Sequence, residues 1–114
     1  DALYEDWASE ERERLLSLYL RAADKLAGLL IERGEYDEAL DICQAIIARD
    51  ACWERAYRLM MTAHARQGNR PLALRAYQRC TTILRDELGV EPSAATTALY
   101  RQIAQSDEAP AATL

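Results

Sequence analysis

The chain has 114 residues, a formal net charge of −5 and a composition that is half apolar, with only three prolines and four glycines. This length fits one domain, and a sequence dominated by Ala, Leu, Glu and Arg favours helices. The longest apolar run, Leu29-Leu30-Ile31, is too short to span a bilayer, and the first residues do not form a signal peptide. We therefore expect a soluble cytoplasmic protein without membrane association.

The first predicted helix begins near Asp6 or Ser9 and ends before Gly34. Tyr4 and Trp7 precede its main apolar pattern, and we interpret them as an N-terminal docking edge or as rings packed on the first or second helix. Within the helix, apolar residues recur at intervals of three and four. This pattern predicts one buried stripe, formed by Leu15, Leu18, Tyr19, Ala22, Ala23, Leu26 and Leu30.

An internal repeat follows the first helix. The segment GEYDEAL at residues 34–40 aligns with GNRPLAL at residues 68–74, a spacing of 34 residues. This is the length of a tetratricopeptide repeat, which consists of two helices joined by a glycine turn. One such hairpin cannot bury its apolar face alone, so it stacks on the next. Gly34 and Gly68 are expected to reverse the chain in the left-handed conformation.

The remaining helices are predicted over about residues 36–49, over about residues 52–67, and from a cap at Asn69 to Gly89. A fifth helix at about residues 93–105 caps the array. The expected fold is all-α, with tetratricopeptide-like hairpins and about five helices in a right-handed array. We expect a single domain over residues 1–105, with repeats at about 20–53 and 54–87, followed by a disordered tail at 106–114.

Several segments carry a family resemblance. WERAYRLM at residues 53–60, ALRAYQRC at 73–80 and ELGVEPS at 87–93, followed by Leu99-Tyr100, resemble the bacterial transcriptional activator domain. The early segments DWA at 6–8 and ERERL at 11–15 are similar to its first long helix. That domain occurs in Streptomyces antibiotic regulatory proteins and in related large ATP-binding regulators.

The resemblance covers about residues 7–103. It implies a tetratricopeptide-like module that adjoins a winged-helix DNA-binding domain and takes part in regulation through protein contacts. Members of the family often carry another helical hairpin upstream. We therefore expect the chain to be a fragment of a longer regulator.

Charge is segregated along the chain. Residues 51–85 contain seven arginines and one acid, a net charge of +6, which leaves −11 for the rest. On the third helix, basic and hydroxyl side chains are spaced three, four and four residues apart, so they share one side of the helix. In a tetratricopeptide-like hairpin this side faces the concave groove. The predicted groove contacts on the first and third helices are Arg21, Asp24, Arg55, Arg58, Thr62 and Arg66.

Three interpretations of these arginines remain open. In the first, they pair with acids of the first repeat, such as Asp24, Glu32 and Glu35, in exposed pairs worth roughly 0–1 kcal/mol each. In the second, they capture an acidic segment of a partner through charge-assisted contacts. In the third, they track nucleic-acid phosphates, which the acidic total disfavours. We expect no direct nucleic-acid contact from this domain.

The predicted function is that of a protein-interaction or oligomerisation module of a bacterial transcriptional regulator. It would couple effector or partner binding to DNA binding elsewhere in the parent chain. The expected partners are other domains of the parent regulator, the transcription machinery, or a second copy of the chain in a homodimer. The alternative is a sensor whose arginine-lined groove binds a small anionic ligand and changes the angle between the hairpins.

The sequence offers little catalytic chemistry. His64, the single histidine, is expected to be packed and hydrogen-bonded within the core. Cys43 and Cys80 occupy core positions, whereas Cys52 stands at a helix start, where a thiolate is favoured. Three cysteines without a CxxC spacing indicate neither a disulfide framework nor a zinc site. We therefore predict no enzyme activity, no catalytic residue, no cofactor and no metal.

Overall fold

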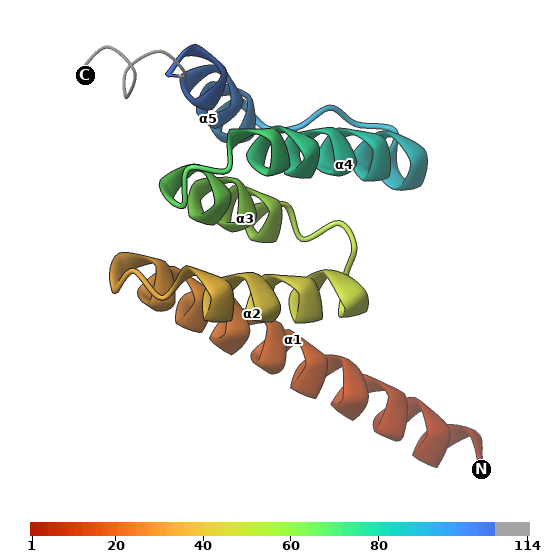
Figure 1. Cartoon of the computed structure of the whole chain (residues 1–114). Coiled ribbons are helices and arrows are strands. Elements are labelled where there is room, and N and C mark those ends of the chain that lie inside the picture. Colours follow the sequence, from red (N-terminus) through yellow and green to blue (C-terminus); the bar gives the residue numbers. More distant parts are fainter. Residues whose placement is uncertain (107–114) are drawn as a thin grey trace.

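The computed structural model describes residues 1–106, so the expected tail lies outside the described residues except for Ser106. This part of the chain forms five helices and no strand. The helices are stacked in chain order from α1 to α5 (Figure 1), and the predicted all-α array of helical hairpins is confirmed. The elements are α1 (Ala2–Glu32), α2 (Tyr36–Arg49), α3 (Glu54–Arg66), α4 (Arg70–Leu88) and α5 (Ala94–Gln105).

Two glycine turns close the two hairpins in the same way. Gly34 and Gly68 have φ angles of 77° and 79°, the left-handed conformation that ends a helix without a Cβ clash. Both predicted chain reversals are confirmed. The 34-residue repeat is therefore also a repeat of backbone geometry. The closing hydrogen bonds, each 2.8 Å long, run from the N–H of Glu35 to the carbonyl of Leu30 and from the N–H of Asn69 to the carbonyl of His64.

The substitution Gly34→Ala is expected to lower the free energy of unfolding by about 1 kcal/mol, because a Cβ strains the left-handed backbone. No neighbouring atom lies within 4 Å of the added carbon, so this strain is local. Gly28→Ala is the control, since Gly28 lies inside α1 without a positive φ, and its Cβ would meet one guanidinium nitrogen of Arg55 at 3.0 Å. Urea denaturation measures the free energy of unfolding of both variants. Equal losses in Gly34→Ala and Gly28→Ala would contradict a strained left-handed backbone at residue 34.

The core lies between the hairpins and continues beneath α5. Ala27, Ala39 and Ala73 are fully buried, and their small side chains let the helix backbones approach one another. Tyr57 of α3 is the largest fully buried side chain. Its hydroxyl donates a 2.7 Å hydrogen bond to the carbonyl of Ala51. The centre of the core is therefore closely packed, and its phenol group is hydrogen-bonded.

The start of α1 differs from the prediction. The helix begins at Ala2 rather than near Asp6 or Ser9, because the Asp1 carboxylate accepts a 2.8 Å hydrogen bond from the N–H of Leu3 and caps it. The N-terminal half of α1 extends beyond the other helices (Figure 1). None of the helices in residues 1–106 is long and apolar enough to cross a membrane.

The predicted single buried stripe on α1 was wrong. The side chains that face the core are Leu20, Ala23, Ala27 and Ile31. Only Ala23 belongs to both sets, and Leu30 is half-buried. The reason is that α1 carries apolar residues on two opposite faces, and the predicted stripe follows mainly the outer face. Its exposed members are Leu15, Leu18, Tyr19, Ala22 and Leu26.

The last helix, α5, packs against α3 and α4. Tyr100 stacks on Tyr77 of α4 with ring centroids 4.1 Å apart. The guanidinium of Arg70 donates to the carbonyls of Ile103 and Ala104 at 3.1 and 2.8 Å. These carbonyls belong to the last turn of α5, where helices leave acceptors without intrahelical partners. Arg70 therefore fastens the C-terminal end of α5 to the start of α4.

Candidate interaction groove

The predicted groove residues lie on α1 and along one side of α3, and all of them except Arg58 line one of two hollows. The N-terminal hollow, of about 430 Å³, lies at the start of α3 and is lined by Arg21, Asp24, Asp50, Cys52, Trp53, Glu54 and Arg55. The C-terminal hollow, of about 280 Å³, lies at its end and is lined by Thr62, Ala65, Arg66, Leu99, Gln102, Ile103 and Ser106. Arg58 lies between them on α3 and lines neither hollow.

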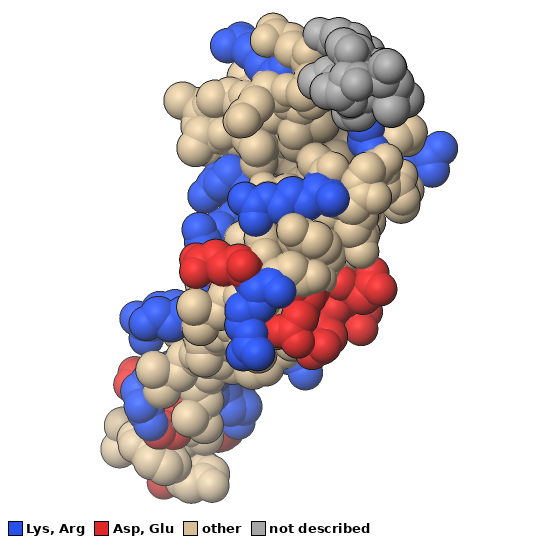
Figure 2. All heavy atoms as spheres, turned by 60° about the vertical axis from the view of Figure 1, so that its left-hand side comes forward, with Lys and Arg blue, Asp and Glu red and all other residues tan. Residues whose placement is uncertain are grey.

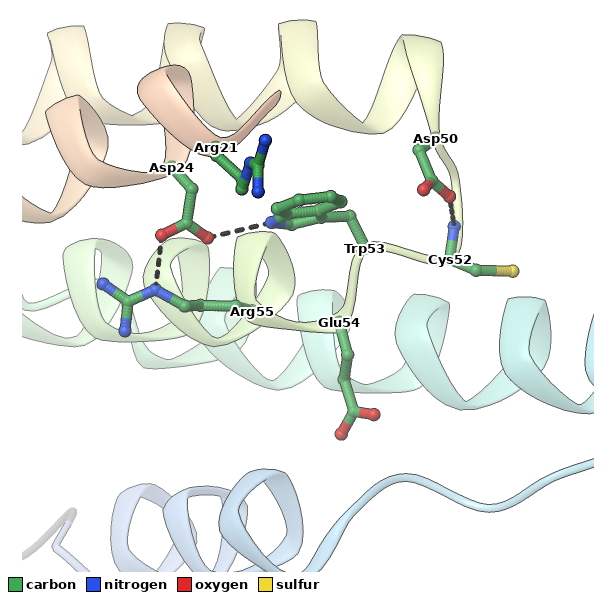
Figure 3. A pocket seen from close by; sticks show the side chains of 7 residues that line it. All are labelled: Arg21, Asp24, Asp50, Cys52, Trp53, Glu54 and Arg55. Atoms are coloured by element: carbon green, nitrogen blue, oxygen red, sulfur yellow. Dashed lines mark hydrogen bonds and ion pairs between the residues drawn. The ribbon is translucent and has the colours of Figure 1, made fainter. Parts of the chain in front are cut away.

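Asp24 binds two of the side chains that line the N-terminal hollow. Its carboxylate accepts hydrogen bonds from Nε of Arg55 at 2.7 Å and from the indole N–H of Trp53 at 2.8 Å (Figure 3). Arg55 extends across α1 above Gly28, where a Cβ would lie 3.0 Å from its guanidinium. This ion pair joins the two hairpins and neutralises Arg55. Trp53, which sequence reasoning did not select as a site residue, forms the aromatic wall.

Arg21 differs from Arg55 in its partners. Among residues 1–106 its side chain has no hydrogen bond or ion pair, and in Figure 3 its guanidinium points toward the Trp53 indole. Glu54, although it lines the same hollow, points away from it toward α5. The N-terminal hollow therefore contains one internally paired arginine and one arginine that remains available.

A polar cluster, formed by Glu54, Arg58, Ser93 and Thr96, connects α3 to the start of α5. The Thr96 side chain is fully buried. Its hydroxyl donates to the Glu54 carboxylate and accepts a 2.9 Å hydrogen bond from Arg58. The same carboxylate accepts the backbone N–H of Ser93 at 2.8 Å and lies 3.6 Å from Arg58. Arg58 therefore helps to hold α5 against α3. We name this set of four residues the Thr96 cluster.

The ionisation of Glu54 makes the stability contributed by the Thr96 cluster depend on pH. Burial acts to raise the pKa of its carboxyl, but the hydrogen bonds from Thr96 and Ser93, together with the Arg58 charge, hold that pKa below its usual value of 4.5. The unfolded chain therefore binds this proton more tightly than the folded chain. The resulting stabilisation is fully present above the unfolded pKa and is lost as pH falls through the folded pKa.

We expect Glu54→Gln to be less stable than the wild type at about pH 7 and to approach it in acid, because the lost carboxylate matters only while it is ionised. Urea denaturation at several pH values between about 7 and 3 measures this difference. Glu38→Gln, an exposed change on α2, is the control and should match the wild type throughout. If Glu54→Gln were less stable than the wild type by the same free energy at every pH, the predicted pH dependence would be contradicted.

The C-terminal hollow is mainly apolar, with one cation. Leu99 and Ile103 of α5 and Ala65 of α3 supply the apolar lining. Arg66 is exposed and, within the described part of the chain, has no hydrogen bond or ion pair. Thr62 is half-buried beside it. The groove therefore offers a second available arginine, at the opposite end of α3 from Arg21.

The predicted charge segregation is visible on part of the surface. On the face shown in Figure 2, the upper part, which α3 to α5 form, shows Lys and Arg but no Asp or Glu side chains, whereas the lower part, toward α1 and α2, shows both. Other arginines of the basic segment already have internal partners. Arg79 donates to Gln44 at 3.3 Å, and Arg85 pairs with Glu91 at 2.7 Å. The number of basic residues thus overstates the number available for binding.

The single histidine and the two core cysteines agree with their predictions only in part. His64 is half-buried, and its Nδ1 has no hydrogen-bond partner among the described residues, contrary to the prediction. Burial lowers its pKa, so the ring is neutral at pH 7. Burial raises the pKa of Cys43 and of Cys80 to about 12.

The favoured thiolate predicted for Cys52 was wrong. Burial raises the pKa of this thiol, and the carboxylates of Asp50 and Glu87 raise it further. Cys52 also lies in the turn before α3, not in its first helical turn. Residues 1–106 contain no group of three or more side chains able to hold a metal ion.

The stacked helical hairpins define the chain as a tetratricopeptide-like module. The model of the bacterial transcriptional activator domain matches residues 1–104, and the chain belongs to this family. It is therefore a module of the kind found in transcriptional regulators, and the resemblance seen in the sequence is confirmed.

Two curated relatives support this assignment. Both are named Regulatory protein AfsR, one from Streptomyces griseus and one from Streptomyces coelicolor, and each is 31% identical to this chain over 102 or 103 residues. The alignments cover 90% of this chain but 10% of each relative, so the chain spans about a tenth of their length. No solved structure matches the chain.

Proposed function

We propose that the chain is a non-enzymatic protein-interaction module of a longer transcriptional regulator, and that its groove binds an acidic segment of a partner or of another domain of the parent chain. One observation carries this proposal. Arg21 of α1 and Arg66 of α3 have no internal partner in residues 1–106, and they line hollows at opposite ends of α3. Arg55 and Arg58 lie between the two hollows' available arginines. Arg55 is paired with Asp24, and Arg58 is paired within the Thr96 cluster.

The dimensions of α3 suggest the size of the bound segment. At 1.5 Å per residue, its 13 residues span about 20 Å, which an extended peptide covers with about six residues. Acidic side chains at the two ends of such a segment would reach Arg21 and Arg66, while apolar side chains would rest on Trp53 and Leu99. Binding would then require no internal ion pair to break, and added salt would weaken it.

The lining of the N-terminal hollow favours a peptide over a small anion. Asp24, Asp50 and Glu54 line it together with two arginines, one of which is already paired, and the Glu54 side chain points away from it. A small anion would therefore meet the carboxylates of Asp24 and Asp50 beside a single available cation. An acidic peptide can place its charge at Arg21 and its apolar groups elsewhere, so the structure gives the sensor alternative less support.

Fluorescence anisotropy with a labelled peptide of alternating glutamate and leucine tests this proposal. The wild type should bind the peptide, and Arg21→Glu/Arg66→Glu should weaken binding at least tenfold, which corresponds to about 1.4 kcal/mol. Arg75→Glu/Arg101→Glu changes the net charge equally at two exposed positions outside both hollows and should bind nearly as well as the wild type. No binding by the wild type, or equal losses in the two variants, would refute a groove-specific contact.

A further inference from the structure

The outer face of α1 carries an exposed apolar stripe. Its six large side chains form three pairs whose partners are three positions apart, and the pairs repeat every 11 residues. An 11-residue repeat completes three turns of a nearly straight helix, so all three pairs stay on one face. We name this set the outer stripe: Tyr4, Trp7, Leu15, Leu18, Leu26 and Leu29, with exposures between 44% and 65%.

The outer stripe is separate from the core and from the groove. The residues of α1 that pack in the core, such as Leu20 and Ala27, lie on the opposite side of the helix, because successive residues are rotated by about 100°. A helix with apolar residues on two opposite faces is typical of one that packs between two neighbours. Within the described chain, α2 and α3 are the only helices in contact with α1, and they cover only its inner face.

We propose that the outer stripe is a homodimer interface in which the α1 helices of two copies pair in antiparallel orientation. The spacing of the stripe is symmetric about its centre, so the same positions recur when the helix is reversed. In this pairing, Tyr4 meets Leu29 of the second copy, Trp7 meets its Leu26, and Leu15 meets its Leu18. Such self-complementarity is the requirement for an interface with two-fold symmetry.

Charge along α1 favours the antiparallel orientation. Residues 5–13 contain five acids and one arginine, whereas residues 20–28 contain Arg21 and Lys25 against the single acid Asp24. The antiparallel register places these two segments side by side. A parallel pair would instead place the acidic segment of one copy along that of the other, and like charges at an interface are unfavourable.

The available surface is close to that of a small stable interface. About half of the surface of six large side chains amounts to roughly 600 Å² per copy, compared with roughly 800 Å² per partner in a standard interface. This inference is separate from the groove proposal, because no member of the outer stripe lines either hollow; Arg21, which lines the N-terminal hollow, enters only the charge argument.

Sedimentation equilibrium of the 114-residue chain over a range of concentrations tests the dimer. The wild type should pass from monomer to dimer, and Leu15→Glu/Leu18→Glu should remain monomeric with unchanged helical circular dichroism. Leu88→Glu/Val90→Glu, which alters two exposed apolar residues beyond α3, should still dimerise. A monomeric wild type would show that another segment or partner covers the stripe, and dimers in all three proteins would place the interface elsewhere. Either result would overturn the proposal.

Disulfide formation tests the orientation. In a Cys52→Ser background, chains with Tyr4→Cys are mixed with chains of different mass that carry Leu29→Cys, and the mixture is oxidised in air. The antiparallel pair predicts mixed disulfides between the two chains in large excess over disulfides within either population. Efficient self-coupling of the Tyr4→Cys chains would show a parallel pair and overturn the proposed orientation.

Discussion

Replacing Tyr57 with alanine is expected to lower the free energy of unfolding by about 3–5 kcal/mol, the usual loss for a large aromatic side chain removed from a core. Tyr57 is fully buried at the centre of the fold, and the Arg79 guanidinium lies 5.9 Å from its ring centroid. The substitution leaves a cavity and removes the hydroxyl that donates to the Ala51 carbonyl. Urea denaturation followed by circular dichroism measures the loss.

Tyr57→Phe separates packing from hydrogen bonding. It keeps the ring and removes only the hydroxyl, so a loss of about 1 kcal/mol is expected. If Tyr57→Ala were no more destabilising than Tyr57→Phe, the ring would contribute little to stability. Its position as the largest fully buried side chain would then have no energetic consequence.

Thr96→Val is expected to cost about 2 kcal/mol and to loosen α5 before the rest of the fold. The change removes the hydroxyl that donates to Glu54 and accepts from Arg58, and hydrogen bonds to charged groups contribute about 1.5–3 kcal/mol. Hydrogen exchange measured residue by residue should show faster exchange in α5 than in α3.

Two further substitutions are controls for the Thr96 prediction. Thr96→Ser keeps the hydroxyl and should retain most of the stability. Thr97→Val makes the same chemical change one residue later, where the side chain is half-buried and makes no hydrogen bond within the described residues, and should have little effect. Uniformly faster exchange in all five helices of Thr96→Val would contradict a local role for the Thr96 cluster.

The sequence predicted the hairpin architecture well because that architecture depends on local signals. Gly34 and Gly68 occupy equivalent places in a 34-residue period, and each has the positive φ that its turn requires. The bounds of α2 also agree with the prediction of a helix over about residues 36–49, and Ala39, Cys43, Ile46 and Ile47 form its buried side. Regular spacing and turn residues are sufficient to predict these features.

The apolar pattern of α1 shows where periodicity is insufficient. Intervals of three and four identify an apolar face, but they do not show which of two faces meets the core. Leu15 and Leu18 fit the pattern as well as Leu20 and Ala23 do, yet only the latter pair is buried. The orientation of α1 is set by its contacts with α2 and α3, which depend on tertiary packing.

The side of α3 that carries the candidate groove residues was predictable, but the electrostatics of these residues were not. Spacing alone places Arg55, Arg58 and Arg66 on one side of α3. Which of them is available depends on partners far away in the sequence: Asp24 lies 31 residues before Arg55, and Thr96 lies 38 residues after Arg58. Charge counting treats these arginines as equivalent, whereas the structure shows that two are internally paired.

The most direct test of the groove is a two-dimensional amide NMR titration of the ¹⁵N-labelled chain with the glutamate–leucine peptide. We predict that chemical shifts change along the side of α3 between Arg55 and Arg66 and near Arg21, together with the indole N–H of Trp53. Amides near Arg75 and Arg79 on α4 should remain unchanged. Shift changes centred on α4, with none at Trp53 or Arg66, would contradict the account.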